Sequence, residues 1–293
     1  MTEAIGIDIG GTRIKALAVG VDGALGESLR RPTVDDPGGL VDAVREILEV
    51  LGEPSVPVGI AAPGLAAKDH RSIAWMRGRM EALEGLDWSE ALGRPVQVLN
   101  DAHAATLAEA WCGAASGRQD VVMLTLGTGV GGGLLLGGKL VTGGSGRAGH
   151  LGHITIDQSG PADIVGTPGS LEDLVGDHTV QARTGFASTR ELVEAVGAGD
   201  EAAAAHWHNT IHALACGVAG LINAFDPEAV VLGGGIATAD EALFVPLREA
   251  MDTLEWRPFE RAVPLLPAAL GDVAGAVGAG RFAWLHTQQE NGS

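Results

Sequence analysis

One stretch of the 293-residue sequence constrains the fold more than any other: an apolar run that ends in a cluster of glycines, VVMLTLGTGVGGG at residues 121–133. Glycine adopts positive φ without strain and lets a backbone approach a ligand closely. Thr128 adds a hydroxyl among amide groups that no side chain covers. Because such a turn can direct several N–H groups at one anion, most often a phosphate, the stretch predicts a phosphate-binding turn.

The same turn matches the pattern G-x-G-x-x-G through Gly127, Gly129 and Gly132, and a single match of this kind is weak evidence for a dinucleotide site. A dinucleotide fingerprint opens a helix after its third glycine. Here three leucines at 134–136 follow, and more glycine comes after them, which is typical of a second strand. We therefore interpret the stretch as a β-hairpin that binds phosphate, and we do not expect an NAD-dependent dehydrogenase.

A second strand–glycine–strand segment, IGIDIGGTRIKALAV, occupies residues 5–19. Its turn consists of Gly10, Gly11 and Thr12, with Asp8 at the end of the first strand and Lys15 just past the turn. Taken alone, the segment is typical of an ordinary hairpin with a glycine turn. Together with the later hairpin it indicates a weak internal repeat. We therefore expect two related domains that face one nucleotide, with the charge of Lys15 available to a phosphate.

Two further strands end in residues that a ligand site can use. The apolar strand VQVLND ends in Asn100 and Asp101, just before an alanine-rich helix expected at 102–115. The pair has two explanations: helix capping, worth about 1 kcal/mol, or an amide and a carboxylate at the sheet edge where α/β folds bind ligands. We favour the second. A later strand, residues 229–232, runs into Gly233–Gly235, where a flat or charged ligand can approach the backbone.

The loop GGSGRAGHLGHITI, residues 143–156, carries His150 and His153. A lone histidine is most often a satisfied surface or core residue. A pair three residues apart can also ligate a metal, but no cysteine lies nearby in the sequence and no third ligand is evident. Glu172 starts a later helix, where an acid favours the helix dipole. The residues alone leave the roles of these three side chains open.

Length and charge limit the classes of function. A chain of 293 residues can form two domains, and 46% hydrophobic with 19% charged residues indicates a compact globular protein. The net charge of −18 argues against nucleic acid or an anionic membrane as the main partner, but not against nucleotides. Cys112 and Cys216 lie in apolar helical segments, as core thiols of a reducing compartment do. No membrane-spanning run or signal peptide is evident, so we expect a cytoplasmic protein.

Several of these segments together resemble the ROK family (repressors, open reading frames and kinases), a branch of the actin-like ATPase superfamily that includes bacterial glucokinases. The motifs, in the family's order, are IGIDIGGTRIKALAV, GIAAPG, VLNDAHAATLAEAW, LTLGTGVGGGLLLGGKLVTGGSGRAGHLGH and VVLGGGIA. The resemblance implies an α/β fold of two ribonuclease-H-like domains with ATP in the cleft between them. Residues 1–101 plus 276–293 are expected to form the small N-terminal domain, and residues 102–275 the large C-terminal domain.

The resemblance also implies roles for individual residues. The first phosphate loop is expected to consist of Gly10, Gly11 and Thr12, followed by Lys15. The second consists of Gly127, Thr128 and Gly129. The adenosine is expected to be bordered by Gly233, Gly234 and Gly235. Asp8 helps to hold hydrated Mg²⁺. The expected sugar-binding residues are Gly64, Asn100, Asp101, His150, His153 and Glu172. Among these, Asp101 matches the catalytic aspartate.

Two departures from the family pattern change the expectations. Family members carry a structural zinc held by one histidine and three cysteines of a C-x-C-G-x-x-G-C-L-E run, where this chain has Asp163, Val165 and Ser170 in place of the cysteines. Because valine cannot ligate metal, we expect no structural zinc, with Pro161 and Pro168 stiffening the loop instead.

The second departure is His150, which replaces the glutamate of the family's G-E-x-G-H. A neutral imidazole offers one donor and one acceptor, whereas a carboxylate accepts from two hydroxyls. The pattern of hydrogen bonds at one edge of the sugar therefore changes, unless the ring of His150 has rotated out of the site. Glucose is the default sugar, and another or a modified hexose is an alternative.

The function implied is an ATP-dependent hexose kinase that acts on the terminal (6-) hydroxyl, with Asp101 as general base. The alternative is a non-catalytic ROK-type protein that binds or senses a sugar or nucleotide. A ROK regulator would need a DNA-binding domain ahead of IGIDIGG, where only three residues precede Ala4, and the chain is acidic. Polyphosphate is an alternative phosphoryl donor, and relatives make a homodimer the expected assembly.

Overall fold

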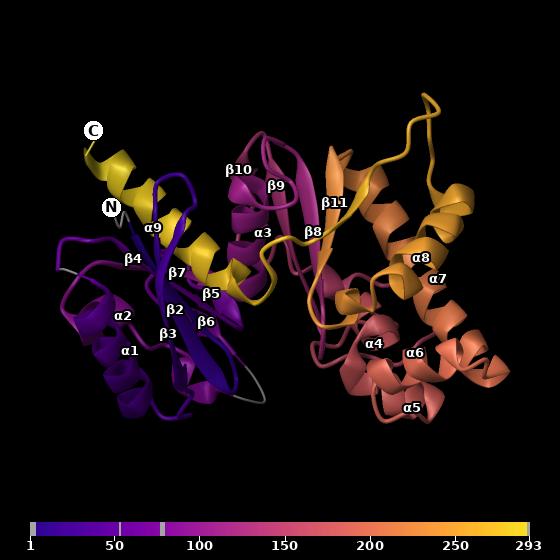
Figure 1. Ribbon diagram of the computed structural model, residues 1–293, viewed down its shortest axis with the longest axis horizontal. Helices are drawn as coiled ribbons and strands as arrows, with labels where there is room; N and C mark the ends of the chain where they lie inside the picture. The colour runs from indigo at the N-terminus through magenta and orange to yellow at the C-terminus, as the bar shows by residue number, and fades with distance from the viewer. Residues whose placement is uncertain (1–3, 53, 77–79, 292–293) are drawn as a thin grey trace. The chain divides into compact units, whose positions relative to one another are not determined.

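The computed structural model of the chain describes residues 4–52, 54–76 and 80–291 (Figure 1). Contacts divide the chain into two compact units. The first comprises the residues up to Gly117, Thr142–Ala148 and the residues from Leu270 on, and the second comprises Arg118–Val141 and Gly149–Ala269. The helix that begins at Asp101 belongs to the first unit and packs against the C-terminal helix, whereas we expected a boundary just after Asp101.

The first unit is a five-stranded sheet with helices on both faces. In spatial order its strands are β3 (Leu25–Pro32), β2 (Arg13–Val19), β1 (Ala4–Ile9), β4 (Val58–Ala62) and β7 (Val96–Asn100). A small second sheet pairs β5 (Leu65–Ala66) with β6 (Ile73–Trp75). The helices are α1 (Pro37–Leu51), α2 (Trp88–Leu92), α3 (Asp101–Cys112) and α9 (Ala274–Asn291), with 3₁₀ turns η1 (Glu81–Leu83) and η5 (Gly271–Val273).

Alternation along β1 decides which side chains meet which helix. Ile5, Ile7 and Ile9 are fully buried in one cluster with the apolar face of α1. The opposite face of the sheet carries Gly6 and Gly59, where an added Cβ would overlap carbonyl oxygens of α9. Helix α9, yellow in Figure 1, therefore packs directly on the strands. Because side chains alternate along a strand, Asp8 shares the α9 face of β1.

The second unit repeats the topology of the first. Its strands, in spatial order, are β10 (Lys139–Leu140), β9 (Val130–Leu136), β8 (Val121–Leu126), β11 (Ala229–Gly233) and β12 (Leu265–Pro267). In both sheets the first three strands pair antiparallel and the last two join in parallel. The internal repeat predicted from the two glycine turns is thus present strand for strand.

The central glycine stretch forms a hairpin. Strand β8 pairs antiparallel with β9 down to Leu126 opposite Val130, so residues 127–129 form the connecting loop. The leucines at 134–136 lie in β9. The interpretation as a hairpin, and not as a strand–helix crossover, is confirmed.

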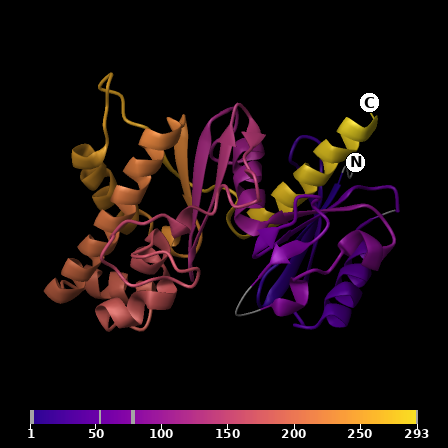
Figure 2. The same ribbon diagram turned by 180° about the vertical axis from the view of Figure 1, so that it is seen from behind.

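Helices complete the second unit. They are α4 (Leu171–Val175), α5 (Val180–Thr184), α6 (Thr189–Gly197), α7 (Glu201–Phe225) and α8 (Glu241–Leu254), with 3₁₀ turns η2 (Leu151–His153), η3 (Asp177–Thr179) and η4 (Ile236–Ala239). Side chains of β8 such as Leu124 share one buried cluster with Leu214 and Val218 of α7. Helices α7 and α8 lie side by side in both views (Figures 1 and 2). Among the described residues, no helix combines the length and apolarity needed to cross a bilayer.

Candidate active site

Asp8 is a strongly perturbed carboxylate at the carboxyl end of β1. It lies opposite Lys15 across the β1–β2 hairpin. At the start of α9, a Cβ on Gly275 would lie 3.0 Å from the carboxyl carbon of Asp8, so glycine there leaves room for the acid. Burial, and then the negative charge of Asp101, raise the pKa of Asp8 to about 7, against the opposing effect of Lys15. The site therefore carries two carboxylates that repel each other.

Basic side chains surround the glycine turn next to Asp8. A cavity of about 470 Å³ is lined by Asp8, Gly10, Thr12, Arg13, Lys15, Arg30 and Asp272. Lys15 Nζ donates to the carbonyl oxygen of Asp272 at 2.9 Å, and Arg30 donates to its carboxylate at 3.1 Å. The turn itself is tied by Gly10 N–H to the Arg13 carbonyl at 3.0 Å and by the Thr33 hydroxyl to the Gly10 carbonyl at 2.6 Å.

Three of these lining residues were missed in the sequence. Arg13 directly follows the glycine turn, so its position next to the predicted loop was a usable signal. Arg30 lies opposite Lys15 in the pairing of β2 with β3, and Asp272 comes from the far end of the chain. Gly11 lies in the turn as predicted, between the lining residues Gly10 and Thr12.

Asn100 and Asp101 occupy the junction of β7 and α3. The side-chain oxygen of Asn100 accepts from the N–H groups of Ala102 (2.9 Å) and His103 (3.1 Å), so Asn100 caps α3. Its amide nitrogen donates to the carbonyl oxygen of Gly64 at 3.0 Å. The capping explanation is therefore correct for Asn100, and a sugar contact by Asn100 stays a prediction. Asp101, exposed as the first residue of α3, accepts from Ala102 N–H at 2.8 Å.

These residues gather at one edge of the sheet. Strands β1, β4 and β7 run parallel, and their carboxyl ends carry Asp8, Gly64, Asn100 and Asp101. Gly64 has φ of +98°, and a Cβ on it would lie 2.7 Å from the carbonyl oxygen of Trp75. A glycine is thus required at this turn. The first unit brings the predicted metal, catalytic and amide residues together, as the carboxyl edge of an α/β sheet does for ligands.

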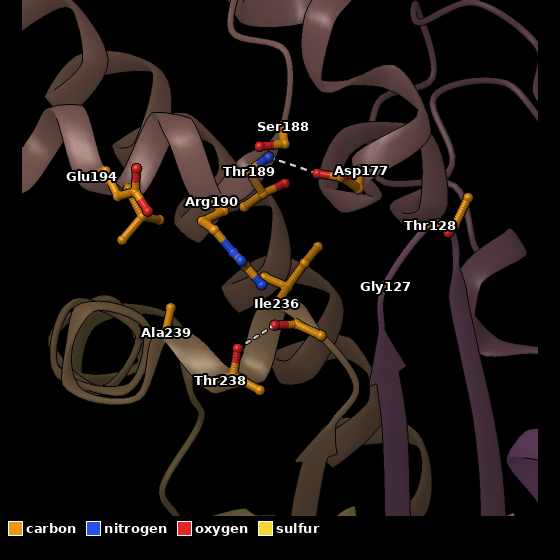
Figure 3. Close-up of a pocket in the computed structure, with 12 residues that line it drawn as sticks. Gly127, Thr128, Asp177, Ser188, Thr189, Arg190, Glu194, Ile236, Thr238 and Ala239 are labelled. Carbon is orange, nitrogen blue, oxygen red and sulfur yellow. Dashed lines mark hydrogen bonds between the residues drawn. The ribbon is translucent and has the colours of Figure 1, made fainter. Parts of the chain in front are cut away.

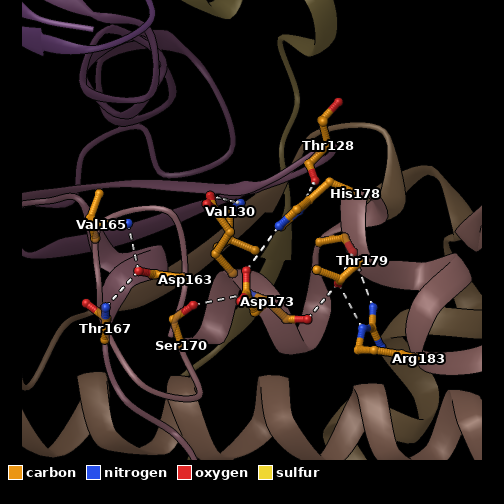
Figure 4. A network of polar contacts seen from close by, with 12 residues as sticks. Thr128, Val130, Asp163, Val165, Thr167, Ser170, Asp173, His178, Thr179 and Arg183 are labelled. Carbon is orange, nitrogen blue, oxygen red and sulfur yellow. Dashed lines mark hydrogen bonds and ion pairs between the residues drawn. The ribbon is translucent and has the colours of Figure 1, made fainter. Parts of the chain in front are cut away.

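The glycine loop at 127–129 is hydrogen-bonded to η3, the 3₁₀ turn that follows α4. The backbone N–H groups of Asp177 and His178 donate to the carbonyl oxygens of Gly127 and Thr128, each at 2.9 Å. The ring of His178 contacts the Thr128 carbonyl through Nδ1 at 2.8 Å and Asp173 through Nε2 at 3.0 Å (Figure 4). His178 and Asp173 belong to no sequence motif, and sequence reasoning missed both.

Glu172 also contacts this loop. Its carboxylate accepts from Val130 N–H at 2.9 Å, and a Cβ on Gly129 would overlap the same carboxylate. Glu172 therefore fixes the end of the glycine loop, and Gly129 is glycine because the carboxylate occupies the space. The predicted contact of Glu172 with sugar stays a prediction.

A larger cavity opens beside the same loop in the second unit. It measures about 730 Å³ and is lined by Gly127, Thr128, Asp177, Ser188, Thr189, Arg190, Val193, Glu194, Gly235, Ile236, Thr238 and Ala239 (Figure 3). The carboxylate of Asp177 accepts from Thr189 N–H at 2.6 Å. Because Asp177 also donates its N–H to Gly127, it connects the start of α6 to the glycine loop. Figure 3 shows Arg190 extending from α6 toward Ile236.

The three glycines after β11 have different positions. Gly235 lines the large cavity. Gly234 has φ of +87°, and a Cβ there would overlap the carbonyl oxygen of Leu126, so it packs against the end of β8. Gly233 is the last residue of β11, where a Cβ would lie 3.0 Å from that of Ala268. The adenosine role of all three stays a prediction.

The histidine pair has two distinct environments. Burial, and then the nearby His153, lower the pKa of His150 below its ordinary value, so its ring is neutral at pH 7. His153 Nδ1 lies 2.8 Å from the carboxylate of Asp163. Val165 has no ligating atom, and the described residues contain no group of three or more His, Cys, Asp or Glu placed to hold a metal. The residues here do not fit the family's zinc site.

Comparisons with known proteins place the chain among relatives of known family. The model of the ROK family matches residues 4–288. The chain is 32% identical to a glucokinase of Thermotoga maritima, over 94% of this chain and 96% of that protein. It is also 32% identical to an N-acetylmannosamine kinase of Escherichia coli O157:H7, over 95% of this chain and 97% of that protein.

A solved structure extends the likeness to the fold. The crystal structure of a ROK family glucokinase from Streptomyces griseus, in complex with glucose and AMPPNP, superposes with a TM-score of 0.79 at 29% identity. The superposition covers 96% of this chain and 98% of that one. The α/β fold of two actin-like ATPase units, expected from the resemblance, is confirmed. The chain belongs to the ROK family.

Proposed function

We propose that this protein is an ATP-dependent hexose kinase that phosphorylates the terminal hydroxyl of glucose or a related hexose, with Asp101 as general base. At the coarser level the chain is a sugar kinase, because curated sugar kinases align with it over nearly their whole length. One observation carries the finer proposal. Asp101 is exposed at the carboxyl end of β7, and its charge acts on the half-buried Asp8 beside a basic glycine turn.

The chemistry requires little beyond positioning, charge neutralisation and a base. As the sugar oxygen attacks the γ-phosphorus, the new P–O bond forms and the bond to the β-phosphate oxygen breaks, which releases ADP. The carboxylate of Asp101 accepts the hydroxyl proton. The hydrogen bond from Ala102 N–H to Asp101 orients the carboxylate at the start of α3. General-base help of this kind contributes about 10²–10⁴-fold to the rate.

Asp8 fits the role of a magnesium-holding residue. Its pKa of about 7 reflects the partial burial of the carboxylate and the charge of Asp101. A divalent cation compensates such a pair, and hard carboxylate oxygens are ligands that Mg²⁺ accepts, commonly with water in the remaining positions. When bound with the nucleotide, the metal neutralises charge on the phosphates.

The nucleotide contacts are assigned from two places in the fold. In the first unit, Gly10, Thr12, Arg13 and Lys15 offer amides and cations at one cavity. In the second unit, the cavity of about 730 Å³ at Thr128, Arg190 and Gly235 has the size of a small-molecule site. We assign phosphates to the glycine turns and the adenosine to the larger cavity. ATP is the donor we propose because the family glucokinase compared above binds AMPPNP.

His150 makes the identity of the sugar a separate question. A half-buried neutral imidazole replaces a family carboxylate, and sites built from hydrogen bonds discriminate strongly against mismatched hydroxyls. The relatives include both a glucokinase and an N-acetylmannosamine kinase. We therefore propose glucose or a close relative of it as substrate. A cytoplasmic homodimer that binds neither nucleic acid nor membrane stays a prediction.

The decisive experiment is a coupled ADP-release assay with the purified chain, ATP and Mg²⁺. The sugars are glucose, mannose, N-acetylmannosamine and N-acetylglucosamine, and mass spectrometry of the product locates the phosphate. We expect turnover on at least one hexose with the phosphate at the terminal position. Turnover on none of them would contradict the proposal and favour a binding or sensing protein.

A further inference from the structure

The loop between η2 and α4, where the family carries its zinc ligands, forms a small closed hairpin in this chain. Gly169 N–H donates to the Pro161 carbonyl at 2.7 Å, and Asp163 N–H donates to the Thr167 carbonyl at 2.9 Å. A tight turn closes the tip, where Gly166 N–H donates to the Asp163 carbonyl at 2.9 Å and Gly166 has φ of +90°. The loop therefore has its own hydrogen-bonded framework.

The two carboxylate oxygens of Asp163 have different hydrogen-bond partners. Oδ1 accepts from the N–H groups of Val165 at 3.0 Å and Thr167 at 2.8 Å, which closes the turn (Figure 4). Oδ2 lies 2.8 Å from His153 Nδ1. The carboxylate is fully buried. Burial acts to raise the pKa of Asp163, but hydrogen bonds, led by that from His153, lower it below its ordinary value, so the group stays ionised.

An ionised carboxylate only accepts hydrogen bonds, and this determines the tautomer of the neighbouring ring. Since Oδ2 offers no proton, the contact requires hydrogen on Nδ1 of His153. In a neutral imidazole the other nitrogen, Nε2, is then an acceptor. The side chain of His153 remains 28% exposed, so the ring is not sealed inside the protein. In this geometry Asp163 orients the ring of His153 through Nδ1 and leaves Nε2 for a ligand.

We propose that Asp163 is a positioning residue for the sugar site: it closes the loop that has lost its zinc ligands and holds His153 with Nε2 as a hydrogen-bond acceptor for a sugar hydroxyl. The inference rests on the proposed function, because His153 is assigned to the sugar by resemblance. It goes further in that a carboxylate of this chain, and no metal, determines which hydrogen bond the histidine can make.

The test uses Asp163→Asn, with Asp157→Asn as the matched control. An asparagine oxygen can still accept from Val165 and Thr167, but its NH₂ group would face His153 Nδ1 and favour the opposite tautomer. Asp157 lies in the same loop, and its carboxylate accepts from Ser159 N–H at 2.9 Å. For Asp163→Asn we expect KM for the sugar to rise about tenfold, with kcat and KM for ATP changed less than about twofold. Asp157→Asn should match the wild type.

Two measurements separate this role from a merely structural one. ¹⁵N NMR of the histidine rings, with the His153 signals assigned by their loss in His153→Gln, should give protonated Nδ1 in the wild type and protonated Nε2 in Asp163→Asn. Protonated Nε2 in the neutral wild-type ring would overturn the inference even if the variant fails to fold. A fall in kcat together with an equal rise in both KM values of Asp163→Asn would also overturn the inference. So would a requirement of stoichiometric zinc for activity.

The same data distinguish failure of the inference from failure of the proposed function. A wild-type enzyme without turnover on any sugar contradicts the kinase proposal and the sugar contact together, whatever the NMR result. An active wild type whose tautomer reverses in Asp163→Asn while KM for the sugar is unchanged contradicts the sugar contact of His153 alone.

Discussion

The carboxylate of Asp101 lies close enough to Asp8 for its charge to raise the pKa of Asp8. The two acids come from one sheet edge, at the ends of β1 and β7, which β4 separates. Their repulsion distinguishes them from a structural ion pair, because Asp8 would ionise more easily without the charge of Asp101. The arrangement leads to separate predictions for the two side chains.

Asp101→Asn should reduce turnover by about 10²–10⁴-fold, the usual worth of a general base. The fold should be retained, since an amide oxygen can still accept from Ala102 N–H and the side chain is exposed. Steady-state ADP release and circular dichroism measure the two effects. Glu201→Gln changes an exposed first-turn acid of α7 and serves as the control. Unchanged turnover in Asp101→Asn would remove Asp101 from the mechanism.

Ionisation of Asp8 should cost stability in the absence of Mg²⁺ and nucleotide. The pKa of Asp8 is about 7 in the folded chain, against its ordinary value of 3.8 in the unfolded chain. Because the pKa is raised in the folded state, protonation of Asp8 favours folding. This stabilising contribution is complete below about pH 3.8 and is lost as the pH rises through 7. The Tm of Asp8→Asn minus that of the wild type should therefore increase between pH 5 and pH 8.

Activity should depend on the same group in the opposite direction. In the proposed role Asp8 holds Mg²⁺ in its ionised form, so kcat/KM of the wild type should fall as the pH is lowered below about 7. Asp8→Asn should be nearly inactive at every pH, although it is more stable at pH 8. A difference in Tm that does not change between pH 5 and pH 8 would contradict the assignment.

His178→Ala should loosen the glycine loop at 127–129. The ring contacts the carbonyl oxygen of Thr128 and the carboxylate of Asp173, and both contacts disappear with the side chain. We expect KM for ATP to rise several-fold to about tenfold, the effect of losing one to two hydrogen bonds, with little change in KM for the sugar. His208→Ala, an exposed position on α7, is the control. A larger change for sugar than for ATP would refute the role.

Gly234→Ala and Gly235→Ala form a pair with opposite expectations. A Cβ at position 234 would overlap the Leu126 carbonyl at a positive φ, so the variant should lose more than about 2 °C in Tm. A Cβ at position 235 has open space, so Tm should stay unchanged while KM for ATP rises, because Gly235 lines the large cavity. Thermal melts and ATP titrations check both. Equal Tm values for the two variants would contradict the prediction.

Local sequence predicted the elements that repeat and the places where strands end. The two glycine turns indicated hairpins because glycine follows an apolar run and a second apolar run resumes immediately, and both hairpins are present. Asp8, Asn100 and Asp101 could be placed at strand ends because each of them lies at the end of an apolar run. The two explanations for Asn100 could not be separated by sequence, because capping and ligand binding favour the same residue at the same position.

The partners of these residues were decided by the tertiary structure. Arg30 and Asp272 form a hydrogen bond although they lie 242 positions apart in the sequence. The Asp163 carboxylate contacts His153 only because its loop folds back on itself. Strand register and loop closure bring such groups together, and neither leaves a periodic pattern along the chain. The sequence by itself determined the strands, the glycine turns and the chemistry available at their ends. Long-range packing decided which side chains hold those turns in place, because a hydrogen bond depends on distance in space and not on distance along the chain.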